Sequence, residues 1–274
     1  MRILLTLFIT LFFGSNVLVA ENLDYTIVWE DRFSKEEKVK VEQWLGQVSA
    51  GVFGLLGKYP FTVNYYIHRK DGAREPVPWA NTVRDGEEGV HFHINPDFSL
   101  NDFLADWTAP HEISHLAIPY VGRENMWFSE GYASYLQYLV MAEMGVITKA
   151  EADLRIKERI QRIQSDYRVE VGFLQRSNQL RKQHNYPAVY WGGACFFMEA
   201  NQKLGTDHET SLPDVVRAYQ TQYRLAYTNL DALSDLIQHL DEVSNTRVFT
   251  NIYQVFQEQS ADKAVGSRKL IDKN

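Results

Sequence analysis

The sequence is short of cysteine, of basic charge and of long apolar segments. Its 274 residues include a single cysteine, Cys195, so no disulfide can form within the chain. Acidic residues outnumber basic ones by 35 to 28, and a net charge of −7 offers no general attraction for nucleic acid phosphates. After residue 20, no segment is apolar for long enough to cross a bilayer. These absences exclude a disulfide-stapled scaffold, a nucleic-acid partner and an integral membrane domain.

The first twenty residues have the pattern of a secretory signal peptide. Arg2 places one positive charge before the apolar run 3–13, and small and apolar residues lead to Ala20, where we expect cleavage. The apolar run is shorter than the roughly 20 residues of a membrane span, which favours a cleaved signal peptide. The alternative to cleavage is an uncleaved N-terminal anchor. We therefore expect an exported protein, periplasmic or secreted, with no stable membrane insertion after cleavage. The apolar neighbours of Cys195 predict that this thiol is buried.

Segments with strand character come first in the chain. Alternation of apolar and polar residues predicts strands at 24–29, 61–68 and 89–95. A capping box at 34–37 predicts the start of a helix between the first two strands. The segment 70–84 contains glycine and prolines and is interpreted as a loop with room for a short strand.

From residue 100 onward the periodicity is helical. Helices are predicted at 100–118 (interrupted at Pro110), 128–144, 149–167, 187–203, 212–223, 230–240 and 250–258. Strands followed by helices favour an α+β fold over a parallel βαβ sheet. The expected organisation is a signal peptide at 1–20, a core domain at 21–205 and a helical C-terminal region with a polar tail at 206–274.

The segment 111–115 reads HEISH, an HExxH motif. On a helix, residues four apart share a face, so His111 and His115 can bind one metal ion together. Glu112 lies one step round the helix, where its carboxylate can reach a water on that ion. Zinc favours imidazole nitrogen and carboxylate oxygen, and a catalytic site combines three protein ligands with one water. The motif predicts one Zn²⁺ ion, with Glu112 as the general base.

The third zinc ligand has to come from outside the motif. The metzincin pattern would place glycine at Ile118 and histidine at Val121, so the sequence excludes that class. The residues alone leave Glu124, in the loop 122–125, as a candidate third ligand.

A further segment resembles one group of enzymes. Residues 127–136 read WFSEGYASYL and resemble the WxxEGxAxYL segment of gluzincin metallopeptidases, which include the aminopeptidase-N and glycyl aminopeptidase families. In that pattern the glutamate is the third zinc ligand, on the helix that follows the HExxH helix. The resemblance therefore implies that Glu130 completes the metal site with His111 and His115.

A third segment resembles the aminopeptidase-N family. Residues 190–193 read YWGG, similar to the YxKG segment in which the tyrosine hydroxyl stabilises the oxyanion. The resemblance implies this catalytic role for Tyr190. Tyr186 and His184 are close enough in the sequence to be alternatives, and a packed aromatic residue is the plain structural interpretation of Tyr190.

The chain departs from the aminopeptidase-N pattern in several ways. Fourteen residues, 116–129, separate the second histidine from the glutamate, where that family has eighteen. Gly192 replaces the lysine of YxKG. The strand at the place of that family's GxMEN segment, 89–95, lacks the glutamate that binds a free amino terminus, and Glu87 and Glu88 lie out of register before it. The absence of this amine-binding glutamate favours an endopeptidase or an unusual exopeptidase.

The strand at 89–95 is the expected substrate-binding element. Its edge can pair with the backbone of an extended peptide, and Gly89, Val90 and His91 are the residues predicted to do so. His91 and His93 point to the same face of this strand, which either lines the cleft or is exposed.

These patterns together predict an α+β protein with a zincin-like (thermolysin-like) catalytic core, an N-terminal mixed sheet and a helical C-terminal part. By size, the resemblance is nearest to small bacterial peptidase-MA-like proteins. The expected activity is zinc-dependent hydrolysis of peptide bonds in a peptide or protein substrate. Two alternatives are a non-catalytic peptide-binding or scaffold protein on a zincin fold, and a zinc hydrolase that acts on a non-peptide amide or ester.

Overall fold

The computed structural model describes residues 25–84, 86–225 and 232–267. The predicted signal peptide, 1–20, and the end of the predicted polar tail lie outside these residues. The strands are β1 (Tyr25–Trp29), β2 (Val63–Arg69), β3 (Trp79–Val83) and β4 (Glu88–Ile94). The helices are α1 (Lys35–Leu56), α2 (Leu100–Ala105), α3 (Thr108–His115), α4 (Met126–Glu143), α5 (Lys149–Tyr167), α6 (Phe173–Lys182), α7 (Tyr186–Asp207), α8 (Leu212–Tyr219), α9 (Leu233–Ser244) and α10 (Val248–Glu258). Short helical turns are η1 (Arg123–Asn125), η2 (Gln220–Arg224) and η3 (Asp262–Gly266).

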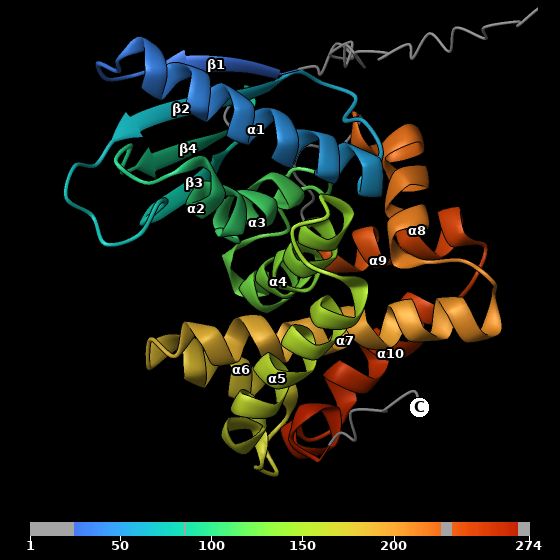
Figure 1. Cartoon of the computed structure of the whole chain (residues 1–274). Coiled ribbons are helices and arrows are strands. Elements are labelled where there is room, and N and C mark those ends of the chain that lie inside the picture. The colour runs from blue at the N-terminus through green and yellow to red at the C-terminus, as the bar shows by residue number, and fades with distance from the viewer. Residues whose placement is uncertain (1–24, 85, 226–231, 268–274) are drawn as a thin grey trace, which may run out of the picture.

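The four strands form one mixed sheet in the order β1-β2-β4-β3. β1, β2 and β4 are parallel, and β3 pairs antiparallel with β4. Helix α1 makes the crossover between β1 and β2, so the chain opens with one βαβ unit and continues with helices. The prediction of an α+β fold is confirmed, with a small sheet and a helical remainder (Figure 1).

β4 has no free edge. Gly89, Val90 and His91 are paired on both sides, with residues 64–66 of β2 and residues 81–83 of β3. The prediction that the edge of this strand pairs with a substrate is therefore wrong, because the neighbouring strands already occupy its backbone groups.

Among the described residues, the edge strands of the sheet are β1 and β3, and β3 lies within the segment that the sequence suggests is a loop. Its five residues, WANTV, are too few to establish an alternating pattern, and the prolines before them dominate the local signal. β3 contains no glutamate, and the one glutamate of β4 is its first residue, Glu88, which pairs with Arg224 at 2.7 Å.

The core of the sheet lies under α1. Trp44, buried on this helix, packs against Phe92 of β4 and Phe103 of α2, with ring centroids 5.3 and 4.9 Å apart. Figure 1 shows α1 lying across the sheet at one end of the molecule and α5, α6, α7 and α10 at the other, with α3 and α4 between them. This arrangement places the HExxH helix between the sheet and the helical part.

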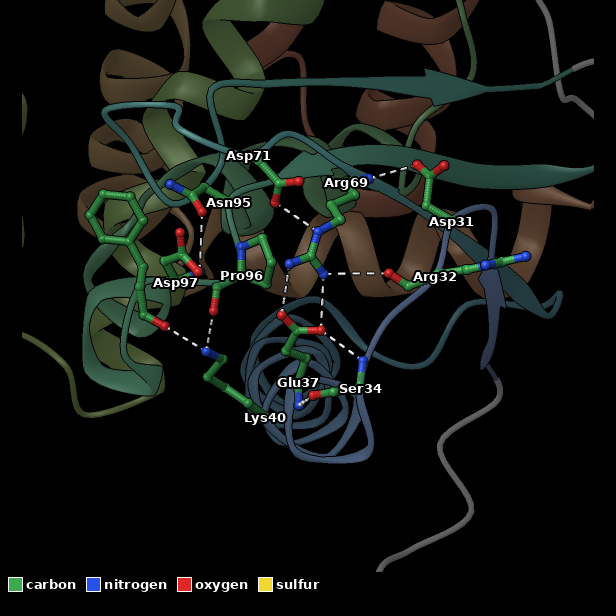
Figure 2. A network of polar contacts seen from close by, with 11 residues as sticks. Asp31, Arg32, Ser34, Glu37, Lys40, Arg69, Asp71, Asn95, Pro96 and Asp97 are labelled. Atoms are coloured by element: carbon green, nitrogen blue, oxygen red, sulfur yellow. Dashed lines mark hydrogen bonds and ion pairs between the residues drawn. The ribbon is translucent and has the colours of Figure 1, made fainter.

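A polar network fixes the start of α1 to the ends of the strands (Figure 2). Ser34 and Glu37 form the predicted capping box, and the Glu37 carboxylate also accepts two hydrogen bonds from Arg69 at 2.9 and 3.0 Å. Lys40 donates to the carbonyl oxygens of Pro96 and Phe98, in the loop that follows β4. A partly exposed ion pair adds at most about 1 kcal/mol, so the network chiefly sets the helix direction.

Two helix predictions differ from the structure. The break expected at Pro110 falls instead at residues 106–107, between α2 and α3. Pro110 is the third residue of α3, where a backbone N–H would have no acceptor within the helix, so proline is tolerated there. The helix begins after Asp106, whose side chain accepts a hydrogen bond from the Thr108 N–H at 2.7 Å. Helix α6 was not expected, because its sequence is polar and buries only Phe173, Ser177 and Leu180.

The remaining predicted helices are found within a few residues of their expected bounds in the described part of the chain. The first two residues of the helix predicted at 230–240 lie outside the described residues. Cys195 is fully buried in α7, as its apolar neighbours predict. Across the described part of the chain, none of the helices combines the length and apolar character that a bilayer crossing requires.

The sheet face opposite α1 has a ladder of stacked rings. It runs Tyr66–His91–His68–His93–Trp79, with centroid separations of 4.5, 5.0, 4.5 and 4.6 Å. His68 and His91 also share a hydrogen bond of 2.7 Å between Nε2 and Nδ1. Burial lowers the pKa of His91 and of His93 below the usual 6.5, and the charge of His68 lowers both further.

This ladder predicts a pH-dependent loss of stability. Because the folded pKa of His91 is depressed, the unfolded chain binds more protons below about pH 6.5, and the free energy of unfolding falls as the pH falls. We expect wild type to lose more stability than His91→Gln between about pH 7.5 and 5.5, by less than about 1 kcal/mol, measured by urea unfolding. His208→Gln, exposed at the end of α7, is the control, and identical pH profiles of wild type and His91→Gln would contradict the prediction.

Candidate metal centre

Two helices bring three ligand atoms to one point. Nε2 of His111 lies 3.2 Å from Nε2 of His115 and 3.2 Å from Oε2 of Glu130, and His115 Nε2 lies 3.6 Å from the same oxygen. His111 and His115 come from α3, and Glu130 from the first turns of α4. Within the described residues, this is the group of histidine, cysteine and acidic side chains that is close enough to hold a metal ion.

The separations fit a tetrahedral zinc ion. Zinc with bonds of about 2.0–2.2 Å places its ligands roughly 3.3–3.6 Å apart, close to the distances observed here. Two imidazoles and one carboxylate leave a fourth position open, as in catalytic rather than structural zinc sites. The residues that are present therefore fit this metal in both chemistry and spacing.

Gln137 orients one of the ligands. Its Oε1 lies 3.0 Å from Nδ1 of His111, and both side chains are buried. Because a carboxamide oxygen only accepts, Nδ1 carries the proton and Nε2 turns its lone pair toward the metal position. Gln137 is not among the site residues predicted from the sequence, although it lies seven residues after Glu130 and therefore on the same face of α4.

Burial and charge oppose each other within the triad. Burial disfavours ionisation of Glu130, but His115 and His111 outweigh it and hold the pKa of this carboxyl well below its usual range. Burial acts to lower the pKa of His111, but the hydrogen bond and the charge of Glu130 outweigh it, so this pKa is raised above its usual value. The metal-free site therefore keeps a proton that a metal ion has to displace, so metal binding weakens as the pH falls.

Two further residues face the same pocket, a cavity of about 770 Å³ that also contains the triad. Burial raises the pKa of Glu112, with His111 and His115 acting against it. Burial also raises the pKa of Tyr190, and the Glu130 and Glu112 carboxylates raise it further, so the phenol remains a hydrogen-bond donor. The ring of Tyr190 stacks on His111 at 6.3 Å.

The alternative residues lie elsewhere. Glu124 is exposed in η1, away from the triad, so the structure does not bring it to the metal position. Tyr186 and His184 hydrogen-bond each other at 3.1 Å and do not line the pocket. His91 and His93 also lie outside the pocket, on the sheet face opposite α1, so of the two interpretations the structure selects the exposed face.

Two arginines, the fully buried Arg224 and the partly buried Arg84, hold the C-terminal end of α3. Arg84 donates to the carbonyl oxygens of His115 and Ile118, and Arg224 donates to that of Leu116 at 2.9 Å. Arg224 also pairs with Glu88 at 2.7 Å. Guanidinium groups satisfy carbonyls that a helix end leaves unpaired and complement its negative dipole end. Nothing in the local sequence pattern indicates this contact, because Arg224 lies more than a hundred residues from α3.

Glycines allow α4 and α7 to touch. A side chain at Gly193 would overlap the carbonyl oxygen of Trp127, and one at Gly131 would overlap the backbone of Gly193. Gly131 directly follows Glu130, and Gly193 lies one helical turn after Tyr190. This close approach places the metal ligand and the phenol on facing helices, which gives the two glycines of the matched segments a packing role.

Comparison with known proteins identifies the fold. No family model and no curated protein matches the sequence. An aminopeptidase N family protein from Idiomarina loihiensis has a similar structure, with a TM-score of 0.61 and 15% identity over 88% of this chain and 46% of that one. An M1 zinc metallopeptidase from Deinococcus radiodurans gives a TM-score of 0.52 and 11% identity over 86% and 48%. The chain thus spans about half the length of these proteins, and the likeness supports a zincin-like fold.

The contact of Gln137 with His111 predicts a loss of metal affinity in Gln137→Ala. Removing the acceptor leaves the imidazole free to rotate and leaves Nδ1–H unpaired, so we expect zinc to bind about 10–100-fold more weakly in competition titrations. Gln137→Glu keeps an acceptor at the same place and should retain wild-type affinity or exceed it. Equal affinities for wild type and Gln137→Ala would show that Gln137 does not orient the ligand.

The contact between α4 and α7 predicts opposite effects for two glycine substitutions in the same helix. Gly193→Ala forces the helices apart, and we expect it to destabilise the fold by about 1–3 kcal/mol in urea unfolding. Gly205→Ala is the matched control, since its new methyl group would meet only a Thr210 carbonyl oxygen at an ordinary 3.8 Å. The Gly205→Ala variant should gain up to about 1 kcal/mol in the free energy of unfolding, because alanine favours a helix more than glycine does. A Gly193→Ala variant as stable as wild type would refute the packing argument.

Proposed function

We propose that the protein is an exported zinc metallopeptidase of the gluzincin type that hydrolyses peptide bonds. The observation that carries the proposal is the meeting of His111, His115, Glu130, Glu112 and Tyr190 in one pocket. Three of these residues fit a zinc ion with an open position, and the other two supply a base and a hydrogen-bond donor. The likeness of the fold to that of M1 zinc metallopeptidases is consistent with this chemistry.

The chain's own groups suit the steps of hydrolysis. Zinc held by the triad would supply an acidified water and polarise the scissile carbonyl. The carboxylate of Glu112 accepts the proton of the attacking water and later delivers it to the leaving amine, a role suited to its raised pKa. The phenol of Tyr190, kept protonated by burial and by the nearby carboxylates, donates a hydrogen bond to the developing oxyanion.

The substrate backbone would lie along β3. This strand is one of the two edge strands of the sheet, and its residues 79–82 line the pocket that contains the triad. An extended peptide can add to such an edge through backbone hydrogen bonds. Because these bonds involve only the peptide backbone, they allow many different side chains in the substrate. β3 thus takes over the substrate-binding role predicted for Gly89, Val90 and His91, and endopeptidase cleavage fits an edge strand without a glutamate.

Export is part of the proposal and is supported by the sequence alone. The charged start, the apolar run 3–13 and the small residues before Glu21 are typical of a cleaved signal. N-terminal sequencing of the protein recovered outside the cytoplasm tests this, and an intact Met1 would favour the anchor instead.

Two variants separate binding of zinc from turnover. We expect purified protein to bind one zinc ion and to hydrolyse peptides, with activity removed by a chelator and restored by zinc. Glu112→Gln should retain zinc, and its kcat should fall by about 10²–10⁴-fold because the general base is missing. Tyr190→Phe should retain zinc and lose about 10²–10³-fold, because one oxyanion donor is gone.

The same experiment distinguishes the alternatives. A protein that binds zinc and peptides but turns nothing over would be a non-catalytic binder, and full activity in Glu112→Gln would overturn the mechanism. Mass spectrometry of the products of a peptide library separates endopeptidase from aminopeptidase action. Hydrolysis of non-peptide amides and esters, compared with that of the peptides, would show whether one of these is the better substrate.

A further inference from the structure

Exposed aromatic side chains gather around the pocket. Among the described residues, the exposed aromatic side chains are Trp79, Trp107, Tyr120 and Tyr186, with 57%, 43%, 45% and 39% of their surface accessible. Trp79, Trp107 and Tyr120 line the pocket of the triad, and Tyr186 packs near the lining Tyr190. Exposed aromatic surface is unfavourable in water, and its concentration at one pocket with convergent polar groups marks a binding site.

The contacts of β3 with α3 show where these rings lie. Arg84, directly after β3, donates to carbonyls at the C-terminal end of α3. Before the two elements, Glu75 and Asp106 line the same pocket and interact electrostatically, so β3 and α3 run side by side in the same direction. Trp79 begins β3 and Trp107 precedes α3, which puts both rings at the same end of the cleft. Tyr120 follows α3 and lies toward the other end.

The two tryptophans are held in place by neighbouring rings. The indole of Trp79 packs on His93, at the end of the ring ladder, with centroids 4.6 Å apart. The indole of Trp107 meets His111 edge to face at 5.5 Å, directly beside the metal position. Rings that are already ordered lose little conformational entropy when a ligand binds against them.

The charge at this end of the cleft is negative. Glu75 and Asp106 line the pocket beside the tryptophans. Burial raises the pKa of Asp106, and the carboxylate of Glu75 raises it further, which shows that the two groups are close. An acidic side chain would be repelled here, whereas a neutral or basic peptide would not.

We propose that Trp79 and Trp107 form a subsite for a large apolar side chain, aromatic or branched aliphatic, next to the scissile bond of an extended peptide on β3. The proposal rests on the proposed peptidase function and adds the substrate class: peptides with a bulky apolar residue at that position and without an acidic residue beside it.

The test compares peptides that differ at one position. A peptide library and mass spectrometry first locate the cleaved bond for zinc-loaded protein, and matched peptides then carry Phe, Ala or Asp at the adjacent position. We expect kcat/KM to be at least about tenfold higher for Phe than for Ala, and lowest for Asp. Trp79→Ala should reduce the Phe-to-Ala ratio about fivefold or more, whereas Leu154→Ala, which removes an equally exposed side chain on α5, should leave it unchanged.

A binding measurement separates the subsite from catalysis. Isothermal titration of intact peptides into zinc-loaded Glu112→Gln protein, with and without Trp79→Ala, measures the preference for Phe without turnover. If peptides are hydrolysed but the Phe-to-Ala ratio of kcat/KM is the same in wild type and in Trp79→Ala, the subsite is refuted and the peptidase function is retained. Binding of the Phe peptide that depends on Trp79, in a protein that hydrolyses no peptide, would support the subsite and refute the peptidase function. A preference for Asp would refute the subsite in either measurement.

Discussion

The structure depends on keeping one largely buried carboxylate beside two buried imidazoles. Oε2 of Glu130 lies 3.2 and 3.6 Å from the nitrogens of His111 and His115, and these residues come from different helices. A carboxylate that loses water needs its partners in place, since an unpaired buried charge costs several kcal/mol. The relative position of α3 and α4 is therefore under tight constraint, and the neighbouring contacts can be understood as ways to maintain it.

The contacts around this site each hold one part of its geometry in place. Gln137 sets the rotation of the His111 ring, and Arg84 and Arg224 set the position of the α3 end by binding its carbonyls. The glycine contact between α4 and α7 sets the distance from Glu130 to Tyr190. Arg224 belongs to η2, so the C-terminal helices contribute directly to the position of the HExxH helix. The helical remainder is thus part of the scaffold of the site.

The pocket combines this rigid centre with an open edge. β3 is paired on one side only, by β4, and its other side borders the cleft beside exposed tryptophans. The ring ladder on the outer sheet face ends at Trp79, so the stacking of His93 reaches the rim of the cleft. The same side chain therefore completes a structural stack and presents apolar surface to a ligand.

Much of the site follows from the sequence by itself, because its signals are local. The spacing of His111 and His115 places both on one face whatever the fold, and most helices have capping or periodicity that any single segment reveals. Glu130 and Tyr190 were reached by resemblance, and the structure brings both to the HExxH helix. Only the tertiary structure decided which strand presents a free edge beside the pocket, since that depends on pairing between distant segments. It also decided that Arg224 holds the end of α3 and that Gln137 meets His111, because such contacts join residues whose sequence positions carry no common pattern.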